Sequence, residues 1–459
     1  MSIDALIDKL TGIVGAENVS LAQADHDVHG SDEGWHDAVA PEGVVSPATT
    51  EEVAQIVGLC ADQGVAVIPF GAGTSLEGHV AALHGGISLD LRRMDQILQV
   101  NAADMDVRVQ AGVRRKQLND RLRHDGLFFP IDPGADASIG GMTATRASGT
   151  NAVRYGTMRE AVMGVTAVLG TGEVVRVGSR ARKSSAGYDL TKLLVGSEGT
   201  LAVITEIVLR VHGIPEVIGG ATASFTTVGD AVTTVIQTIQ LGIPVARIEL
   251  LDASMVEAVN VFSQLDLPEQ PLLLMEFHGG PDAVAEQTRT VRELAEENGA
   301  DSWQASTSTE ERSKLWEARH DAYYAAMNIR PGMKGVPTDV CVPISELAGQ
   351  IDAAVADATE SGLTAPIVGH VGDGNFHVLI IFDPDDGEEK KAALAFHDRL
   401  VHRGLEVGGT CTGEHGIGYG KLAYMTAEHD PAAIQVMRGI KGVLDPAGVL
   451  NPGKVLPAD

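Results

Sequence analysis

The stretch PFGAGTSLEGH at residues 69–79 follows an apolar run, VAVIPF at residues 65–70, that is typical of a buried strand. Its closely spaced glycines allow successive backbone N–H groups to point at one anion, a geometry that suits a pyrophosphate. Two known phosphate loops are excluded, because a Walker loop needs a lysine that the stretch lacks and a dinucleotide fingerprint needs glycine where Leu76 stands. The stretch therefore predicts either a phosphate-binding loop of another type or a purely structural glycine turn.

Glycine is the one residue type in excess, with 53 of 459 residues, which is roughly 12% against a usual ~7%. The glycines form no collagen-like repeat and gather in five stretches, at residues 69–79, 133–156, 196–199, 369–374 and 404–420. Clustered glycines in an otherwise ordinary chain indicate close approach of the backbone to a ligand or to another segment.

The second and third glycine clusters extend this pattern. Residues 132–156 are rich in small and hydroxyl side chains, carry too few charges for a solvated linker, and are expected to form a long functional loop. Such a loop suits a large, flat ligand. The third cluster, GSEGT at residues 196–200, joins a predicted helix to a long β-branched run at residues 200–212.

Composition excludes several classes of function. The 34 Lys and Arg against 62 Asp and Glu leave a formal net charge of −28, which argues against a nucleic-acid partner and against docking on an anionic membrane through a basic patch. Cys60, Cys341 and Cys411 lie far apart, so they predict neither a disulfide framework nor a cysteine-only iron–sulfur cluster. Acidic residues near the start and the lack of a long apolar run predict a soluble, cytoplasmic protein without a transmembrane segment.

The chain changes character near residues 213–218, where we expect a domain boundary. Before it, Thr50 is the expected cap of a helix through residue 61, and residues 163–169 and 173–177 are expected to pair as a hairpin. After it, strands near residues 221–225, 245–250 and 271–278 alternate with longer helices near residues 228–241, 281–299 and 309–327.

A group of histidines and a carboxylate marks the C-terminal half. In GHVGDGNFH at residues 369–377, a glycine-rich turn is expected to place His370 and His377 opposite each other on paired strands. Glu414 and His415 follow in another glycine-flanked loop. Although any one histidine is more often a hydrogen-bonded core residue, two imidazoles and a carboxylate together favour a catalytic metal site for zinc or manganese.

The three glycine loops in this order resemble the FAD-binding domain of the vanillyl-alcohol oxidase and p-cresol methylhydroxylase superfamily. From about residue 40 to the tail, the chain resembles the family of FAD-linked D-lactate dehydrogenases and glycolate oxidase flavoprotein subunits. The resemblance implies an α+β fold: a two-subdomain FAD-binding domain at residues 1–215 (core from about 38), an α/β cap domain with an antiparallel sheet at residues 216–420, and a segment at 421–459 that returns to the FAD domain.

The resemblance also implies site residues. Those expected at the FAD are Pro69, Phe70, Gly71, Ala72, Gly73, Thr74, Ser75 and Gly78 in the first loop, then Pro133, Gly134, Ala135, Ser138, Gly140, Gly141, Thr145, Gly149, Asn151 and Tyr155, and finally Glu198, Gly199, Ile204 and Asn451. Glu198, Gly199 and Ile204 are expected to hold the adenosine end through their backbone. The expected metal ligands are His370, His377 and Glu414, and the expected catalytic residues are His415, Arg319 and Asn375. Since no histidine precedes His79 in the first loop, non-covalent FAD is expected.

The implied reaction is the oxidation of a D-2-hydroxy acid, with D-lactate first and glycolate second. Arg319 would bind the carboxylate, the metal would acidify the hydroxyl, His415 would remove its proton, and the hydride would pass to flavin N5. Electrons would leave to a separate acceptor, namely a cytochrome, a quinone or an electron-transfer flavoprotein, through which the protein could lie at a membrane. The sequence is compatible with a homodimer but does not determine the oligomeric state.

Two other functions compete with this one. A D-2-hydroxyglutarate dehydrogenase would use the same scaffold, but the lysine that such relatives carry before an Asp-X-X-X-Pro element is absent before Asp339, unless Lys334 replaces it. A metal-dependent hydrolase would explain His370, His377 and Glu414 but would leave the glycine loops without a purpose. A binding module without catalysis is the least favoured, because the sequence carries two separate site patterns.

Overall fold

The computed structural model describes residues 3–458, and contacts along the chain divide it into two compact units. The first unit comprises the residues up to 148, residues 156–214 and those from 414 on, whereas the second comprises residues 149–155 and 215–413. We expected the return to the first unit at residue 421. It occurs at Glu414, because Glu77 and Glu198 of the first unit bind the segment around Ile417 and Lys421.

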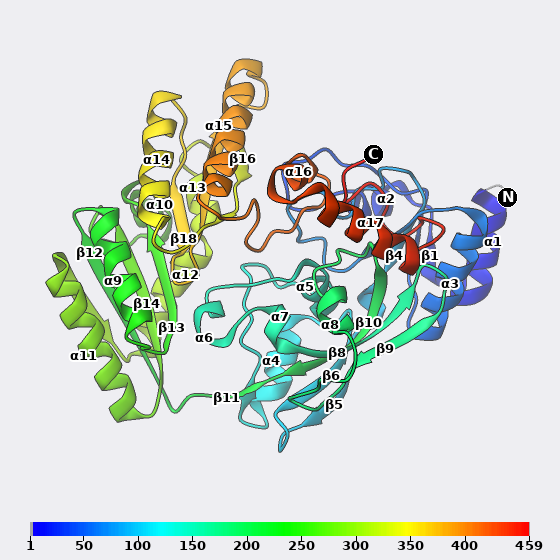
Figure 1. The fold of residues 1–459 in the computed structure, drawn as a ribbon, viewed down its shortest axis with the longest axis horizontal. Coiled ribbons are helices and arrows are strands. Elements are labelled where there is room, and N and C mark those ends of the chain that lie inside the picture. Colours follow the sequence, from blue (N-terminus) through cyan, green and yellow to red (C-terminus); the bar gives the residue numbers. More distant parts are fainter. Residues whose placement is uncertain (1–2, 459) are drawn as a thin grey trace. The chain divides into compact units, whose positions relative to one another are not determined.

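The first unit contains three small sheets (Figure 1). Their strands are β1 (Val19–Ser20), β2 (Gly43–Val45), β3 (Val67–Phe70), β4 (Ile87–Asp90), β5 (Ile97–Asn101), β6 (Asp106–Gln110), β7 (Leu127–Phe128), β8 (Val162–Leu169), β9 (Val174–Gly178), β10 (Ala202–Arg210) and β11 (His212–Gly213). The orders are β1-β2-β4-β3, β5-β6-β10-β8-β9 and β11-β7. In the first sheet β2, β4 and β3 run parallel, while the second is antiparallel throughout and includes the predicted β8–β9 hairpin.

Short helices connect these strands. They are α1 (Ile3–Val14), α2 (Gln23–His29), α3 (Thr50–Gln63), α4 (Arg115–Arg123), α5 (Ile139–Thr145), α7 (Met158–Ala161), α8 (Leu190–Leu194), α16 (Met425–Glu428) and α17 (Pro431–Leu444). One apolar cluster runs through both larger sheets and includes residues of α1, α3 and α5. The N-terminal helix, which the sequence did not place in the core, therefore belongs to it.

Two local expectations were wrong. Helix α3 is capped by Thr49, whose hydroxyl accepts the N–H of Glu52 at 3.1 Å, whereas Thr50 is buried and donates to Thr205 of β10 at 2.9 Å. Burial of Thr50 against a strand distant in the chain decided between two adjacent threonines. The stretch at residues 132–156 also contains α5, because Ser138 caps it and its apolar residues reach the core.

The second unit is built on an eight-stranded sheet of order β15-β12-β14-β13-β18-β19-β16, with β17 pairing β19. Its strands are β12 (Val217–Phe225), β13 (Val245–Leu251), β14 (Leu272–Gly279), β15 (Ala300–Ser306), β16 (Lys334–Pro337), β17 (Val340–Cys341), β18 (Ile367–His370) and β19 (Asn375–Phe382). Its helices are α6 (Ala152–Tyr155), α9 (Val228–Gln240), α10 (Ala253–Ser263), α11 (Pro281–Glu297), α12 (Thr309–His320), α13 (Ala322–Met327), α14 (Leu347–Glu360) and α15 (Gly387–Glu406). All strand pairs of this sheet are antiparallel.

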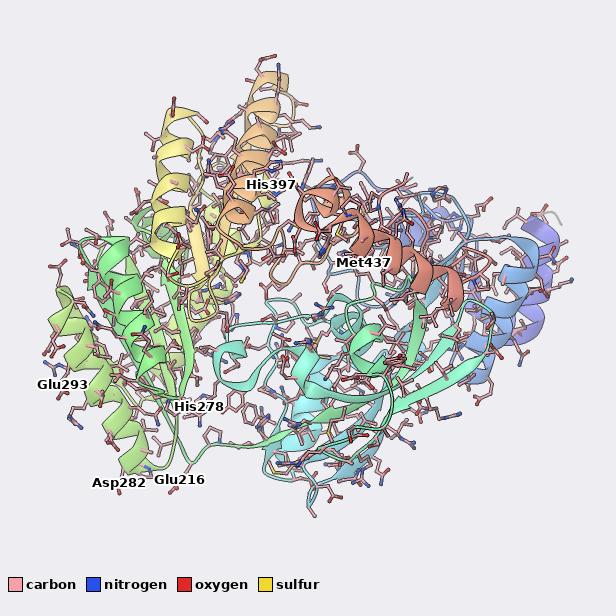
Figure 2. The ribbon with its side chains drawn as sticks, viewed as in Figure 1. Glu216, His278, Asp282, Glu293, His397 and Met437 are labelled. Atoms are coloured by element: carbon pink, nitrogen blue, oxygen red, sulfur yellow. The ribbon has the colours of Figure 1, made fainter. Side chains whose placement is uncertain are left out.

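Helix α11 is amphipathic. On α11, Asp282 and Glu293 point away from the sheet in Figure 2, whereas Val284 and Val291 are buried. A second cluster joins α10, α12 and α13 to inner residues of β13, β14, β18 and β19. Within the described residues, no helix combines the length and the apolar character needed to cross a bilayer.

Candidate functional site

The three N-terminal glycine clusters come together in the first unit. A Cβ atom added at Gly71 would lie 2.3 Å from Ser138 Oγ, and one added at Gly199 would lie 3.0 Å from the ring of Pro69. The loop after β3 thus contacts the residue that precedes α5, and β3 itself contacts the loop before β10. Residues that the sequence separates by about 130 positions therefore form one surface, which suits a single extended ligand such as FAD.

Asp32 binds the first glycine loop, and no sequence pattern indicates this. Its carboxylate accepts hydrogen bonds from Ser75 Oγ at 3.0 Å, from the Gly78 N–H at 2.9 Å and from the His79 N–H at 3.2 Å. Because these N–H groups point at Asp32, a phosphate would have to be bound by the earlier part of the loop, residues 71–75. An isolated acid in a loop has no pattern that would have predicted this contact.

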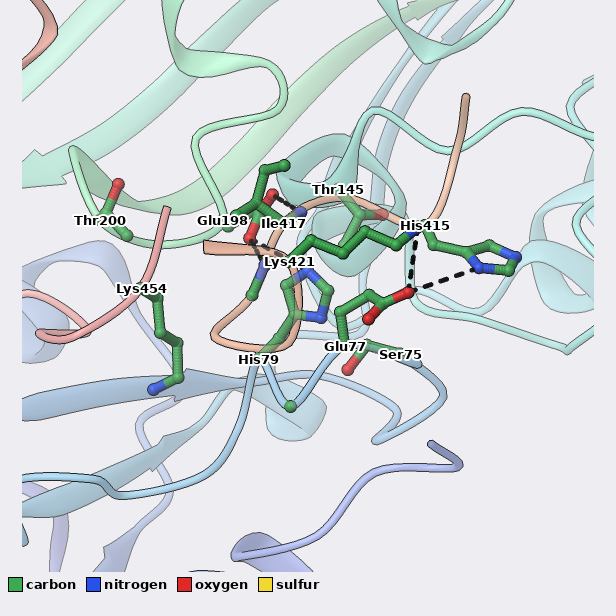
Figure 3. A network of polar contacts seen from close by, with 12 residues as sticks. Ser75, Glu77, His79, Thr145, Glu198, Thr200, His415, Ile417, Lys421 and Lys454 are labelled. Atoms are coloured by element: carbon green, nitrogen blue, oxygen red, sulfur yellow. Dashed lines mark hydrogen bonds and ion pairs between the residues drawn. The ribbon is translucent and has the colours of Figure 1, made fainter. Parts of the chain in front are cut away.

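Glu198 connects the third cluster to the C-terminal segment. It adopts a left-handed backbone conformation, with φ of 53°. Its carboxylate accepts the N–H groups of Ile417 at 2.8 Å and Gly418 at 2.7 Å (Figure 3). Burial alone would raise the pKa of Glu198, but His79 at 3.0 Å and the two N–H groups outweigh it and hold the pKa below its usual value.

The backbone of Glu198 is also engaged. Its N–H donates to the carbonyl of Ala144 at 2.8 Å, and its carbonyl accepts the amide of Asn451 at 2.8 Å. The expected backbone contact of Glu198 with adenosine stays a prediction, while its side chain has a role that the sequence did not indicate. Ile204 lies in the core on β10, and Asn451 also binds the carbonyl of His79 at 3.1 Å.

Glu77 is the centre of a buried charge network in the first unit (Figure 3). One carboxylate oxygen lies 3.2 Å from Lys421 Nζ and 3.8 Å from His415 Nδ1, and the other lies 3.4 Å from His36 Nε2. Burial would raise the pKa of Glu77, but Lys421 and the two histidines lower it well below its usual value, so the carboxylate is charged. The predicted base His415 is therefore held next to a fixed negative charge.

The second unit holds the two predicted metal-binding histidines, in a register that differs from the one expected. His370 pairs with Asn375, and His377 pairs with Val368, so the two histidines are diagonal neighbours rather than direct partners. The turn at residues 371–374 sets this offset. Their rings still lie on one face, 5.4 Å apart between centroids and nearly perpendicular.

Both histidines use the same ring nitrogen toward the protein. His370 Nδ1 lies 2.8 Å from a carboxylate oxygen of Glu249, and His377 Nδ1 lies 2.9 Å from the carbonyl of Thr338. A metal ion would therefore be bound through Nε2 of each ring, which is the arrangement found in most histidine metal sites. The two imidazoles fit the predicted metal within the second unit, whereas Glu414 belongs to the first unit, so its part in the metal site stays a prediction.

Arg319 and Asn375 are both engaged within the second unit. Arg319, on α12, directs Nε and Nη2 to one oxygen of Glu249, at 2.9 and 2.6 Å. Burial would raise the pKa of Glu249, but His370 and Arg319 lower it. Asn375 donates its amide to Asp339 at 2.7 Å and to the carbonyl of Val340 at 3.0 Å, so it supports the turn beside the histidines.

Gly149, Asn151 and Tyr155, which are expected at the FAD, lie in a segment at residues 149–155 that belongs to the second unit. Asn151 accepts a hydrogen bond from Arg247 Nε at 3.1 Å, and the hydroxyl of Tyr155 lies 2.8 Å from His278 Nδ1. His278 in turn lies 2.7 Å from Glu276. Arg247 also stacks on Trp316, with its guanidinium 4.7 Å from the ring centroid. These contacts order the segment on β13 and β14.

The comparisons with known proteins cover the whole chain. The profile described as FAD linked oxidases, C-terminal domain, matches residues 214–455, and that of an FAD binding domain matches residues 41–178. A probable mitochondrial D-lactate dehydrogenase of Danio rerio is 48% identical, covering 99% of this chain and 92% of the relative. A mitochondrial D-lactate dehydrogenase [cytochrome] of Arabidopsis thaliana is 43% identical (98% and 80%), and glycolate oxidase subunit GlcD of Bacillus subtilis (strain 168) is 31% identical (98% and 97%).

Solved structures confirm the predicted fold class. p-Cresol methylhydroxylase with substrate bound has a TM-score of 0.80 at 18% identity, covering 98% of this chain and 96% of that one. An alkyldihydroxyacetonephosphate synthase has a TM-score of 0.79 at 20% identity, covering 99% and 86%. At such identities the likeness concerns the fold alone.

The predicted cytoplasmic location is contradicted. The relatives from Danio rerio and Arabidopsis thaliana are named as mitochondrial proteins. The prediction was wrong because it rested on acidic residues near the start and on the lack of a long apolar run, and neither feature distinguishes one aqueous compartment from another.

Removing the buried charge of Glu77 should destabilise the protein. Glu77→Gln removes the carboxylate that lies 3.2 Å from Nζ of Lys421, a lysine with no exposed surface, so we expect the free energy of unfolding to fall by about 3–5 kcal/mol. Denaturant unfolding measures this. Adding Lys421→Met to Glu77→Gln is the matched control and should recover most of the loss, whereas a single variant as stable as wild type would contradict the expectation.

Lys454 should make stability depend on pH. Burial lowers the pKa of Lys454 from 10.5 to about 7, although Glu198 and Asp32 oppose the shift. The unfolded chain therefore binds more protons between about pH 7 and 10.5, and the residue's contribution to stability rises with pH across that window. Denaturant unfolding from pH 7 to 10 should show this rise in wild type and in an exposed control, Lys391→Met, but a smaller rise in Lys454→Met. Equal slopes in all three would contradict it.

Proposed function

The chain belongs to the family of FAD-linked oxidases and is an FAD-dependent D-2-hydroxy-acid dehydrogenase, and we propose that D-lactate is its main substrate, with glycolate next. The relatives named as mitochondrial D-lactate dehydrogenases are 38–48% identical to it, whereas a D-lactate dehydrogenase of Anaerostipes hadrus is 33% identical and the relative named for glycolate is 31% identical. The order of the two substrates rests on this difference.

The observation that carries the proposal is the position of Glu249. One of its carboxylate oxygens binds Arg319, and the other binds His370. The guanidinium of Arg319 can bind a substrate carboxylate, and the imidazole of His370 can bind a metal ion, so Glu249 holds these two groups next to each other. A 2-hydroxy acid carries its carboxylate and its hydroxyl on adjacent carbons. Groups that recognise both must therefore lie close together, as these two residues do.

Each residue has a proposed role. FAD, when bound, supplies flavin N5 as the hydride acceptor, and a divalent cation, Zn or Mn, supplies Lewis acidity toward the hydroxyl. Arg319 binds the substrate carboxylate through Nη1, because its other nitrogens are directed to Glu249. His370, His377 and Glu414 hold the cation.

His415 accepts the hydroxyl proton. The carboxylate of Glu77 lies 3.8 Å from Nδ1 of His415 and favours a proton on that nitrogen, which leaves Nε2 as the atom that takes the proton. The FAD is bound without a covalent link, because the first loop has Gly73 and Thr74 where a histidine would be needed, and His79 is buried against Glu198.

The register of the sheet supports a monocarboxylic substrate. Lys334, which would have to replace the missing lysine of a D-2-hydroxyglutarate dehydrogenase, is exposed and pairs with Phe382. Phe382 is five residues from His377 along β19, which is about 17 Å, and an odd offset places it on the opposite face. The alternative of a metal-dependent hydrolase does not account for the FAD-binding domain.

A separate electron acceptor, such as a cytochrome, must reoxidise the flavin. Three cysteines are too few for a cluster ligated by four thiolates. The relative from Arabidopsis thaliana is named as a cytochrome-type enzyme, which favours a cytochrome over a quinone or an electron-transfer flavoprotein.

A panel of acids tests the substrate. Under anaerobic conditions, D-lactate should bleach the flavin fastest, glycolate more slowly, and L-lactate and D-2-hydroxyglutarate at least about 100-fold more slowly, since stereochemistry and the second carboxylate both oppose binding. Stopped-flow absorbance measures the rates. Faster bleaching by D-2-hydroxyglutarate than by D-lactate would reject the proposed substrate.

Removal of the metal tests the cation. After dialysis against a strong chelator, D-lactate should no longer reduce the flavin, while dithionite still does and the flavin content is unchanged. Added Mn²⁺ or Zn²⁺ should restore the reaction. Full activity in protein shown by elemental analysis to be free of metal would remove the cation from the mechanism.

A further inference from the structure

Glu249 is a buried residue of the second unit that no sequence pattern singled out. It lies on β13 and is 1% exposed. β13 pairs with β18 through Leu250 and Gly369, so Glu249 faces His370 across the two strands. Each carboxylate oxygen has its own partner: one lies 2.8 Å from His370 Nδ1, and the other accepts both bonds from Arg319.

We propose that Glu249 is a positioning residue that holds His370 as the Nδ1–H tautomer, ready to bind a divalent cation through Nε2, and at the same time directs Arg319 toward the substrate. This inference rests on the proposed function and deepens it. One side chain would then set both the cation and the carboxylate contact.

The chemistry of the carboxylate gives the reason. An ionised carboxylate only accepts hydrogen bonds, so the ring nitrogen of His370 that faces it must carry the proton. The proton of a neutral imidazole then lies on Nδ1, and the lone pair lies on Nε2. Carboxylates that bind metal-ligating histidines in this way fix the ring and raise metal affinity.

A glutamine at this position cannot replace the carboxylate. Its amide has one acceptor and one donor group, so it can accept from His370 or from Arg319 but not from both. If the NH₂ group faces His370, the imidazole must take its other tautomer, in which Nε2 carries the proton and cannot bind a metal. If the NH₂ group faces Arg319, two donors meet and the guanidinium must turn away.

The second unit provides a matched control. Glu276 on β14 is also buried and also lies close to a histidine, with His278 Nε2 at 2.7 Å. Both pairs join a buried carboxylate to an imidazole, although His278 uses Nε2 where His370 uses Nδ1, and His278 is not among the proposed metal ligands. Glu276→Gln therefore tests whether the loss of any buried carboxylate–histidine pair in this sheet affects the metal.

The experiment compares wild type, Glu249→Gln, Glu249→Asp and Glu276→Gln as purified, flavin-containing proteins. Metal affinity is measured by titrating chelator-treated protein with Mn²⁺ and determining the bound metal by elemental analysis. We expect Glu249→Gln to bind Mn²⁺ about 10–100-fold more weakly, Glu249→Asp to recover part of the affinity, and Glu276→Gln to match wild type. The KM for D-lactate at saturating Mn²⁺ should also rise about tenfold in Glu249→Gln, because a neutral amide holds Arg319 less firmly than the carboxylate does.

A second measurement needs no variant at position 249. In metal-free wild-type protein with FAD bound, the ¹⁵N spectrum of His370, assigned by its loss in His370→Gln, should show the Nδ1–H tautomer. An Nε2–H tautomer would overturn the proposal, even if Glu249→Gln failed to fold.

The outcomes separate this proposal from the proposed function. If wild type binds Mn²⁺ and is reduced by D-lactate, but Glu249→Gln binds Mn²⁺ with equal affinity, Glu249 has no positioning role and the proposed function stands. If Glu249→Gln and Glu276→Gln lose affinity equally, the effect is a general loss of structure and the proposal is also overturned. A wild-type protein with affinity for neither Mn²⁺ nor Zn²⁺ would overturn both this proposal and the proposed role of the cation.

Discussion

The buried carboxylate of Glu198 is the interaction on which the first unit's loops depend. A buried charge is costly unless it is paired and hydrogen-bonded, and Glu198 meets this requirement only when three segments are in place. Its partners are His79 from the first glycine loop and the N–H groups of Ile417 and Gly418, which are 219 and 220 residues away in the chain. Satisfying this one group therefore brings the C-terminal segment, and with it His415, to the loop after β3.

The second unit uses the same device in a sheet. Glu249 lies opposite His370 because β13 and β18 are paired, and Arg319 reaches it from α12. Here the strand ladder supplies the positions and the carboxylate supplies the orientation. In both units a buried carboxylate connects residues of separate elements. Such a group contributes by defining a single arrangement of these residues rather than by adding to the net free energy of unfolding.

The sequence predicted the elements of the site better than the contacts between them. The β8–β9 hairpin and the strands on either side of residues 371–374 follow from glycine turns and alternating apolar residues, which are local properties. The pairing of His370 with Asn375 rather than His377 depends on the conformation of a four-residue turn. Asp32 was missed because an acid in an irregular loop carries no local sign of its hydrogen-bond donors.

The sequence by itself determined where the backbone can approach a ligand and where imidazoles and carboxylates are available, because glycine spacing and residue chemistry do not depend on the rest of the chain. Only the tertiary structure decided which acid meets which base: Glu77 with Lys421, Glu198 with His79, and Glu249 with both Arg319 and His370. Each pair joins segments that packing brings together. The residues next to a glutamate in the sequence do not show whether its side chain is buried or which base it will contact. Its partner is therefore defined only once the core around it has formed.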